Sequence, residues 1–268
     1  MKTLVFIPSY NCEKQITRVL KQFNSEVLNY IDEIILVNNR STDKTEKNAI
    51  DYARSHKELP IKILRNNDNY GLGGSHKVAF KYALKNKFDY IIVLHGDDQG
   101  NIKDILKVLK SEKYKEYDCC LGARFHKQSR IEGYSTFRTF GNKVYNSLFS
   151  LVVRYKVKDL GSGLNMYSTR MLKNKFYMRF PNDLTFNYCM ILASNYYKHR
   201  VCFFPISWRE EDQISNVKMI NQAFKVLGML GKYILYKGKF IKSNINNDKN
   251  HHDYTYKIVY EREDVYDK

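Results

Sequence analysis

The sequence contains no run of about 18 uninterrupted apolar residues, so it predicts no membrane-spanning helix. It also has no basic segment followed by an apolar one at its start, and we therefore expect no signal peptide. The five cysteines lack the spacing of a zinc or redox motif. These absences favour a cytoplasmic protein whose thiols are reduced.

Acidic residues are few relative to basic ones. The 268 residues include 45 Lys and Arg but 28 Asp and Glu, which gives a formal net charge of +17. An excess of this size indicates an anionic partner, namely nucleic acid, an anionic membrane surface or a phosphorylated substrate. The 22 tyrosines suit base stacking and membrane interfaces alike, so composition alone leaves these partners open.

Apolar runs alternate with helical spacing through the first part of the chain. We expect strands at residues 3–7, 33–37, 61–64, 90–94 and 118–121, and helices at 15–23, 43–55, 78–85 and 102–110. This alternation predicts an α/β fold with a mostly parallel sheet flanked by helices.

The alternation breaks down from Gly122 onward. We expect helices at residues 137–153, near 169 and at 186–194, strands at 164–167 and 200–206, and a long amphipathic helix at 219–240. A polar run at 244–253 is typical of a linker, and 254–260 of a strand or an ordered tail. The predicted organisation is an α/β domain at 1–218, the amphipathic helix at 219–241, and a polar linker and tail at 242–268.

The stretch from Phe88 to Asn101 changes abruptly from apolar to polar after residue 94. His95, Asp97 and Gln99 come directly after the predicted strand, where open α/β sheets bind ligands. Carboxylate and amide oxygens suit Mg²⁺ or Mn²⁺, with a nucleotide diphosphate supplying further ligands, and neutral His95 suits Mn²⁺. The plain alternative is a solvated loop whose acids cap the next helix.

A glycine-rich segment at residues 69–77 precedes the next predicted helix. Gly71 and Gly73 allow close approach of a ligand, the helix start offers N–H groups to anions, and Lys77 adds a charge. The alternative is a flexible turn at a helix entry. Together with the polar stretch after residue 94, the segment favours a metal–diphosphate site.

A loop at residues 208–218 comes after the last strand of the predicted core. Arg209 and Lys218 bracket small polar and acidic residues, including Ser215. Such a loop can close over phosphates. The alternative is a charged surface loop.

Seven segments, in order, resemble motifs of glycosyltransferase family 2, with its GT-A (Rossmann-like, nucleotide-sugar-binding) fold. The chain most resembles the dolichyl- or polyprenyl-phosphate sugar transferases. The segments are residues 7–11 (IPSYN), 37–45 (VNNRSTDKT), 69–80 (NYGLGGSHKVAF), 95–99 (HGDDQ), 122–124 (GAR), 159–163 (DLGSG) and 208–218 (WREEDQISNVK).

The resemblance implies a role for each matching residue. Nucleotide-sugar binding falls to Pro8, Tyr10, Asn11, Asn38, Asn39, Gly71, Gly73, Lys77, His95 and Asp97. Acceptor or phosphate binding falls to Arg124, Ser162, Gly163, Arg209, Ser215 and Lys218. The implied metal ligands are Asp97, Gln99 and His95, and the implied catalytic residues are Asp97, Arg209 and Asp183.

The departures from the family pattern concern the nucleoside and the metal. Asn38 and Asn39 stand where the family usually has aspartates, which leaves the base open. His95 replaces the first acid of the metal motif, so Asp97 and Gln99 are the principal expected ligands and Asp98 is the rival.

The acceptor decides whether the implied inverting, single-displacement transfer needs a base. A lipid phosphate is already anionic and attacks unaided, whereas a sugar hydroxyl needs a carboxylate within reach. Asp183 stands where hydroxyl-directed relatives place that carboxylate, and it is equally suited to capping a helix that begins near Leu184. Both a polyprenyl-phosphate acceptor and a glycan acceptor therefore stay open.

Lysines recur every seventh residue along the predicted C-terminal helix, at positions 218, 225, 232 and 239. With the apolar residues between them they favour an interfacial helix, and the helix at 137–153 offers a second contact. We expect peripheral binding to the anionic inner face of the membrane, although a helix packed on the domain is the commoner case.

A nucleic-acid-binding protein is the third hypothesis, which the absence of a recognised module disfavours. Oligomers remain open.

Overall fold

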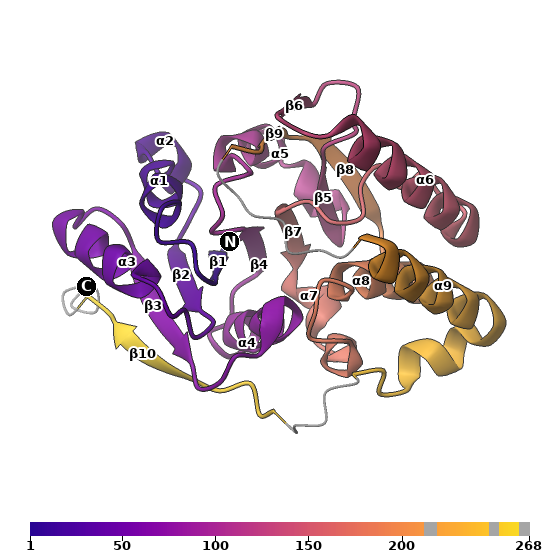
Figure 1. Ribbon diagram of the computed structural model, residues 1–268. Coiled ribbons are helices and arrows are strands. Elements are labelled where there is room, and N and C mark those ends of the chain that lie inside the picture. Colours follow the sequence, from indigo (N-terminus) through magenta and orange to yellow (C-terminus); the bar gives the residue numbers. More distant parts are fainter. Residues whose placement is uncertain (212–218, 247–251, 263–268) are drawn as a thin grey trace.

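The computed structural model describes residues 1–211, 219–246 and 252–262, and its centre is an eight-stranded sheet (Figure 1). The strand order across the sheet is β10-β3-β2-β1-β4-β7-β5-β8. The strands are β1 Thr3–Ser9, β2 Glu33–Asn38, β3 Ile61–Asn66, β4 Tyr90–Leu94, β5 Cys119–Ala123, β7 Leu164–Ser168, β8 Val201–Pro205 and β10 Tyr256–Tyr260. A separate parallel pair joins β6 Arg130–Glu132 to β9 Ser207–Arg209.

Six strands of the sheet run in one direction. Strand β1 pairs in parallel with β2 and β4, β2 with β3, and β5 with β8. Strand β7 is antiparallel to both β4 and β5, and β10 is antiparallel to β3. The predicted mostly parallel α/β fold is confirmed. As a result the carboxyl ends of six strands and the amino end of β7 meet at one edge of the sheet.

Helices cover both faces of the sheet (Figure 1). Along β1, Leu4 and Phe6 point into one core, while Val5 and Ile7 point into the other, as the period of two in a strand requires. The first face is covered by α4 Gly71–Lys85, α6 Thr136–Val153, α7 Thr169–Leu172, α8 Phe186–Tyr196 and α9 Met219–Lys242. The second is covered by α1 Ile16–Lys21, α2 Ser25–Leu28, α3 Thr45–Ser55 and α5 Leu106–Lys110. Short 3₁₀ helices occupy Ile102–Ile105, Lys113–Glu116 and Phe176–Arg179.

Helix α4 starts earlier than its sequence predicts. The sequence favours a loop at the glycine segment and a helix at 78–85, but the glycine segment forms the first turns of the helix. Gly71 has φ +67°, a conformation that residues with a side chain rarely adopt. A β-carbon on Gly73 would lie 2.4 Å from the Pro181 carbonyl oxygen, so this glycine permits close packing against residues 181–182.

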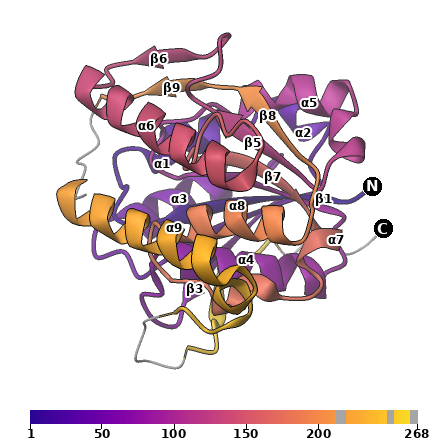
Figure 2. The ribbon, with the colours of Figure 1, turned by 90° about the vertical axis from the view of Figure 1, so that its right-hand side faces the viewer.

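Helices α6 and α9 lie side by side on one face of the molecule (Figure 2). Helix α9 rests on α8, where the Tyr233 hydroxyl donates to the Leu192 carbonyl oxygen at 3.0 Å. It is kinked at Tyr236, which has non-helical dihedral angles. Within the described ranges no helix combines the length and apolar character needed to cross a bilayer.

The segment after α9 returns to the sheet instead of trailing away. Strand β10 adds to the edge of β3 and resolves the choice between a strand and an ordered tail in favour of a strand. The polar run at 244–253 lies partly outside the described residues.

Candidate active site

The ends of β1 and β4 are in close contact at the carboxyl edge of the sheet. The Gly96 amide donates to the Pro8 carbonyl oxygen at 3.0 Å. A β-carbon on Gly96 would lie 2.6 Å from the Ser9 hydroxyl oxygen, so this position requires glycine. Tyr10 comes next after Ser9 and is half exposed, which makes its ring available to a ligand. The structure therefore brings together two of the segments expected at the nucleotide.

Asp97 lies just after β4 and is only partly exposed at this edge. Burial, together with the nearby carboxylates of Asp98 and Glu210, raises the pKa of its carboxyl to about 6. The hydrogen bond from the Gln99 amide lowers this pKa, but by less than burial raises it. A carboxyl group in this environment is poorly stabilised as an anion. A cation placed beside it would restore the ionised form, so the environment of Asp97 fits a divalent metal ligand.

Gln99 is also suited to a metal. Its side-chain amide nitrogen donates to Glu210 at 3.4 Å, so this bond does not use the amide oxygen that a cation would bind. Glu210 is in turn held by Arg138 at 2.6 Å. Across the described residues no cluster of three or more His, Cys, Asp or Glu side chains forms a metal site. Asp97 and Gln99 therefore fit a metal that takes its remaining ligands from a nucleotide diphosphate.

Asp98, the rival ligand, points into the protein instead. Its carboxylate is completely buried and accepts from Arg18 Nε at 2.6 Å, from Gln22 Nε2 at 2.9 Å and from Arg209 Nη2. This carboxylate is neutralised by two guanidinium groups. The geometry favours Asp97 over Asp98 as the ligand.

His95 packs beneath the polar loop. Its amide donates to the Gly163 carbonyl oxygen at 2.9 Å, and a β-carbon on Gly163 would lie 2.9 Å from the imidazole ring. Burial, with a smaller effect of the Arg124 charge, lowers the pKa of His95 to about 4. The ring is therefore neutral near pH 7, and its Nε2 atom is buried and has no hydrogen-bond partner among the residues that the structure describes. A metal-ligand role for His95 stays a prediction.

Asn39 joins three segments at the nucleotide side. Its Oδ1 accepts from Asn66 Nδ2 and from the Tyr70 amide, both at 2.9 Å, and its Nδ2 donates to Asn69 Oδ1 at 2.7 Å. The Gly71 amide donates to Asn69 Oδ1 as well, at 3.1 Å. The first N–H groups of α4, which the sequence offers to a diphosphate, thus already have acceptors within the protein. Anion binding at Gly71 and Gly73 stays a prediction.

Asn38 and Asn11 shape the neighbouring loop. Asn38 Nδ2 donates to Glu46 at 2.6 Å, and its Oδ1 accepts from the Ser41 amide at 2.9 Å. Asn11 Oδ1 accepts from the Thr42 amide at 2.9 Å. The structure brings Asn11 and Asn38 together around residues 41–42, whereas recognition of a base by either one stays a prediction.

Lys77 is fully buried. Its ammonium donates to the Phe180 carbonyl oxygen at 2.6 Å, to Asn182 Oδ1 at 2.8 Å and to the Tyr254 hydroxyl at 3.0 Å. In this structure the side chain ties α4 to the segment before α8 and to the C-terminal segment. A role at a diphosphate stays a prediction.

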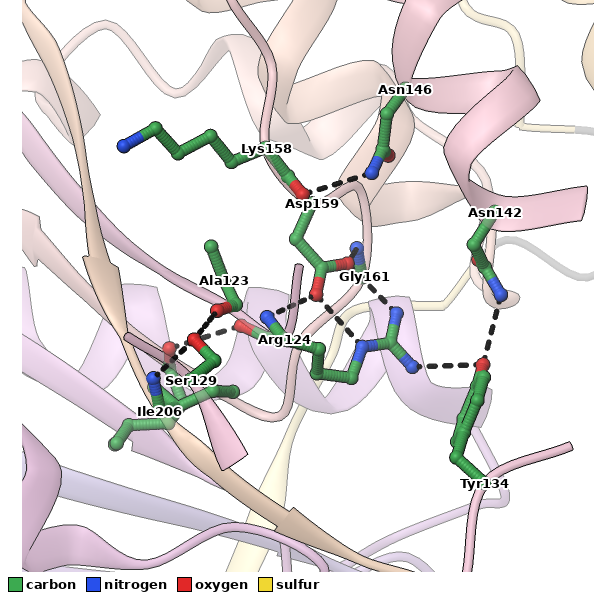
Figure 3. A network of polar contacts seen from close by, with 12 residues as sticks. Ala123, Arg124, Ser129, Tyr134, Asn142, Asn146, Lys158, Asp159, Gly161 and Ile206 are labelled. Carbon is green, nitrogen blue, oxygen red and sulfur yellow. Dashed lines mark hydrogen bonds and ion pairs between the residues drawn. The ribbon is translucent and has the colours of Figure 1, made fainter. Parts of the chain in front are cut away.

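Arg124 is buried in a network of polar contacts after β5 (Figure 3). Its Nε and Nη2 atoms donate to the two carboxylate oxygens of Asp159 at 2.8 Å each, and Nη1 donates to the Tyr134 hydroxyl at 3.3 Å. The ring of Trp208 lies 5.0 Å from the guanidinium carbon. Burial alone would lower the pKa of Arg124, but Asp159 outweighs it and the pKa is raised. The charge of Arg124 is neutralised internally, and phosphate binding by it stays a prediction.

The remaining acceptor-side residues precede β7. The Ser162 hydroxyl is buried and donates to the Leu164 carbonyl oxygen at 3.2 Å, while Gly163 adjoins His95. Ser215 and Lys218 lie outside the described residues.

Asp183 lies in the turn that leads into α8, whose N-cap residue is Thr185. Its Oδ1 accepts from the Thr185 amide at 2.8 Å and from the Thr185 hydroxyl at 2.5 Å, and its Oδ2 accepts from Lys225 of α9. Burial alone would raise the pKa of Asp183, but the bonds from Lys225 and Thr185 outweigh it and lower the pKa. Asp183 thus holds the N-cap residue and is not itself the N-cap, and its role as a base stays a prediction.

Sequence reasoning missed the partners of Asp98. Arg18 lies 80 residues from Asp98 along the chain, and Arg209 lies 111 residues from it. Arg18 carried no local signal, since it looks like an ordinary exposed residue of an amphipathic helix. Two consecutive acids after a buried strand are the signal that one of them needs an internal partner.

Comparison with known proteins places this site in a family. The family described as Glycosyl transferase family 2 matches residues 4–176. An uncharacterized protein of Methanocaldococcus jannaschii is 31% identical over 169 residues, which cover 63% of this chain and 65% of the relative, slightly under two thirds of its length. A dolichol-phosphate mannosyltransferase of Pyrococcus furiosus is 27% identical over 145 residues, 53% of this chain and 39% of that protein. Dolichyl-phosphate beta-glucosyltransferase ALG5C of Trichomonas vaginalis is 23% identical over 244 residues, 85% of this chain and 67% of that protein.

Solved structures share the fold. S. aureus TarS in complex with UDP-GlcNAc has a TM-score of 0.58 at 18% identity, over 88% of this chain and 67% of that chain. Glucosyl-3-phosphoglycerate synthase from Mycobacterium tuberculosis in complex with UDP has a TM-score of 0.57 at 13% identity, over 96% and 86%.

The chain belongs to glycosyl transferase family 2, since the family match covers more than half of its length. The predicted family and fold are therefore confirmed.

Proposed function

We propose that this enzyme is an inverting, metal-dependent transferase that moves a sugar from a nucleotide-diphosphate donor to a polyprenyl phosphate at the inner face of the membrane. The named relatives from P. furiosus and T. vaginalis, both dolichyl-phosphate transferases, support the acceptor class. The UDP-bound relatives of known structure make a UDP-sugar the first donor to test. Family membership favours a transferase over the nucleic-acid-binding alternative.

Asp97 and Gln99 would hold Mg²⁺ or Mn²⁺, which would supply positive charge for the leaving diphosphate. The nucleotide would bind beside Tyr10, Asn11 and Asn38. The neutral His95 ring would lie below it, packed against Gly163. Arg209 supplies a half-exposed guanidinium beside this edge. In an inverting displacement the acceptor oxygen attacks the anomeric carbon, and the electron pair of the broken bond leaves with the diphosphate.

The state of Asp183 is the observation that carries the choice of acceptor. A carboxylate held by Lys225 and by two Thr185 donors, with a lowered pKa, is a weak base. A phosphate acceptor needs no base, because it is already anionic. The environment of this residue therefore supports a lipid phosphate over a sugar hydroxyl.

Replacing Asp183 with Asn should leave transfer to polyprenyl phosphate nearly unchanged. Asn can still accept the bond from the Thr185 amide, so the start of α8 is retained. If a sugar hydroxyl were the acceptor, loss of the base should reduce the rate by about 100-fold or more. Initial rates with each acceptor, measured side by side for both proteins, distinguish the two cases. A large loss with polyprenyl phosphate would contradict the proposal that transfer to this acceptor needs no base.

One observation supports the second candidate function, which is transfer to a glycan. Asp183 is about half exposed and stands where hydroxyl-directed relatives have their base. Release of Lys225 from Asp183 would restore an available carboxylate. The Asp183 experiment decides between these acceptors.

A membrane would be met by the face formed by α6 and α9 (Figure 2). Large apolar side chains stand in solvent on both helices, namely Phe137, Phe140, Val144 and Leu151 on α6 and Phe224, Leu227, Ile234 and Leu235 on α9. Lys143, Lys232 and Lys239 are interspersed with them. An apolar area interspersed with lysines fits an anionic lipid surface, where the aromatic rings would enter the interface and the ammonium groups would meet the headgroups.

Replacing Phe137 and Phe140 together with Ser should weaken vesicle binding by at least about 10-fold, since burying each ring contributes about 1.5 to 3 kcal/mol. The two rings are 69% and 68% exposed, so the fold should be unaffected. Co-sedimentation with vesicles of phosphatidylcholine and phosphatidylglycerol measures the effect. Ile258→Ser is the control, because Ile258 is an exposed apolar residue on β10, away from this face. Equal binding by all three proteins would contradict the proposed surface.

A further inference from the structure

The carboxylate of Asp98 lies between two arginines from distant parts of the chain. Arg18 comes from α1 and Arg209 from β9, and both donate to Asp98 Oδ2. Gln22 Nε2 donates to Oδ1 at 2.9 Å. The Asp98 side chain is 0% exposed, whereas those of Arg18 and Arg209 are 39% and 40% exposed. Part of the Arg209 guanidinium is therefore accessible to solvent, whereas Arg18 also donates through Nη1 to the Lys14 carbonyl oxygen at 3.0 Å.

The backbone conformation explains why the side chains of Asp97 and Asp98 lie in different environments. Asp98 has φ +60°, in the left-handed region that Asp and Asn tolerate best after glycine. This turn leaves Asp97 at the sheet edge and sends Asp98 inward.

Arg209 is fixed to the loop after β4 by three bonds. Its Nη2 donates to the Asp98 carboxylate and its Nε to the Asp98 carbonyl oxygen at 3.0 Å. Its own amide donates to the Gln99 carbonyl oxygen, also at 3.0 Å. Because these hydrogen bonds hold it, the Arg209 guanidinium has little freedom to rotate.

The Asp98 carboxylate faces two guanidinium groups, one from Arg18 and one from Arg209. Asp98 also offsets the repulsion between the two cations. The accessible part of the Arg209 guanidinium is therefore suited to an anion.

We propose that Asp98 is a positioning residue for the transfer reaction: its buried carboxylate holds Arg209 in the orientation in which the guanidinium receives the donor diphosphate. This inference rests on the proposed function, because it takes a nucleotide-diphosphate sugar as the donor. Asp98 touches neither donor nor acceptor and acts through Arg209. A purely structural role of Asp98 would give the same contacts, but the effects of Asp98→Asn and Arg209→Gln on kcat/KM would then be additive.

The test is a double-mutant cycle with Asp98→Asn and Arg209→Gln. Asn keeps the shape and tolerates the positive φ, so the variant should fold, which circular dichroism checks. Loss of orientation should lower kcat/KM for the donor by about 10-fold to 100-fold. In the Arg209→Gln background the same Asp98→Asn change should have almost no further effect, because the residue that it orients is gone. In the Arg18→Gln background the effect should persist.

Calorimetric titration of UDP and GDP gives a readout that needs no turnover. Asp98→Asn should weaken whichever nucleotide the wild type binds, and adding Arg209→Gln should weaken it no further. Additive effects of Asp98→Asn and Arg209→Gln, or unchanged binding and kcat/KM in Asp98→Asn, would overturn the positioning role while leaving the proposed function intact. A wild-type protein that neither binds a nucleotide nor transfers a sugar would overturn both.

Discussion

Replacing Asp97 with Asn should reduce sugar transfer by about 100-fold to 1,000-fold, the usual loss when a group that stabilises developing charge is removed. Asn has the same size but no charge, so it can no longer balance a divalent cation at the carboxyl edge of the sheet. The dependence of nucleotide binding on Mg²⁺ or Mn²⁺ should disappear as well. Thermal-shift titration of UDP and GDP with and without the cation measures this directly, since a bound ligand raises apparent stability.

The Asp97 variant should fold at least as well as the wild type. Burial disfavours the charged carboxyl of Asp97, and a neutral amide carries no such penalty. Asp51→Asn is the matched control, because Asp51 is an exposed carboxylate on α3 that pairs with Lys47. If Asp97→Asn retained metal-dependent binding and full transfer, the metal site would have to be elsewhere.

Replacing Asp159 with Asn should lower the free energy of unfolding by about 3 to 5 kcal/mol, because it leaves a buried guanidinium without its counter-ion. Arg124 and Asp159 are both nearly inaccessible, with side-chain exposures of 8% and 1%. The Asp159 carboxylate also accepts from the amides of Arg124 and Gly161, so the change disturbs the turn before β7 as well (Figure 3). Urea denaturation measures the loss.

An exposed ion pair provides the control for Asp159. Glu26 and Lys110 are about half exposed, and Glu26→Gln should leave the unfolding free energy nearly unchanged. The double variant Arg124→Met with Asp159→Leu should recover much of the lost stability, since apolar side chains of similar volume can replace a buried pair. A loss in Asp159→Asn no greater than in Glu26→Gln would show that Arg124 is not held by this pair.

The sheet was predictable because its strands are short apolar runs between helices. Residues 90–94 form a buried strand, and the chain after it must emerge at the ligand-binding edge, so the sequence alone could place Asp97 and Gln99 there. The order of β7, antiparallel between β4 and β5, could not be obtained in this way. A five-residue strand carries no signal in its sequence of the direction in which it runs in the sheet.

The start of α4 was not predictable for a different reason. Glycine lowers helix propensity, so the glycine segment has the composition of a loop. The amides of Tyr70, Gly71 and Gly73 are instead satisfied by Asn39, Asn69 and the Asn182 carbonyl oxygen. The last of these acceptors is more than a hundred residues away, and tertiary contacts of this kind outweigh local propensity.

Charged residues were the hardest to assign. Lys77, Arg124 and Asp98 look like ligand-binding groups in the sequence, because buried charges are rare and a charge is by default expected in solvent or at a site. In the structure each is hydrogen-bonded by partners that only the fold brings near. Asp97 differs from them because burial and neighbouring carboxylates oppose its ionisation and raise its pKa to about 6.

The central claim is that the enzyme transfers a sugar from a nucleotide diphosphate to a lipid phosphate. The most direct measurement incubates the protein with radiolabelled UDP-sugars and GDP-sugars, Mn²⁺ or Mg²⁺, and vesicles with or without polyprenyl phosphate, and then counts the label extracted into organic solvent. We predict label in the lipid fraction only when both polyprenyl phosphate and a divalent cation are present. Label that appears in an added glycan and never in the lipid would contradict the claim.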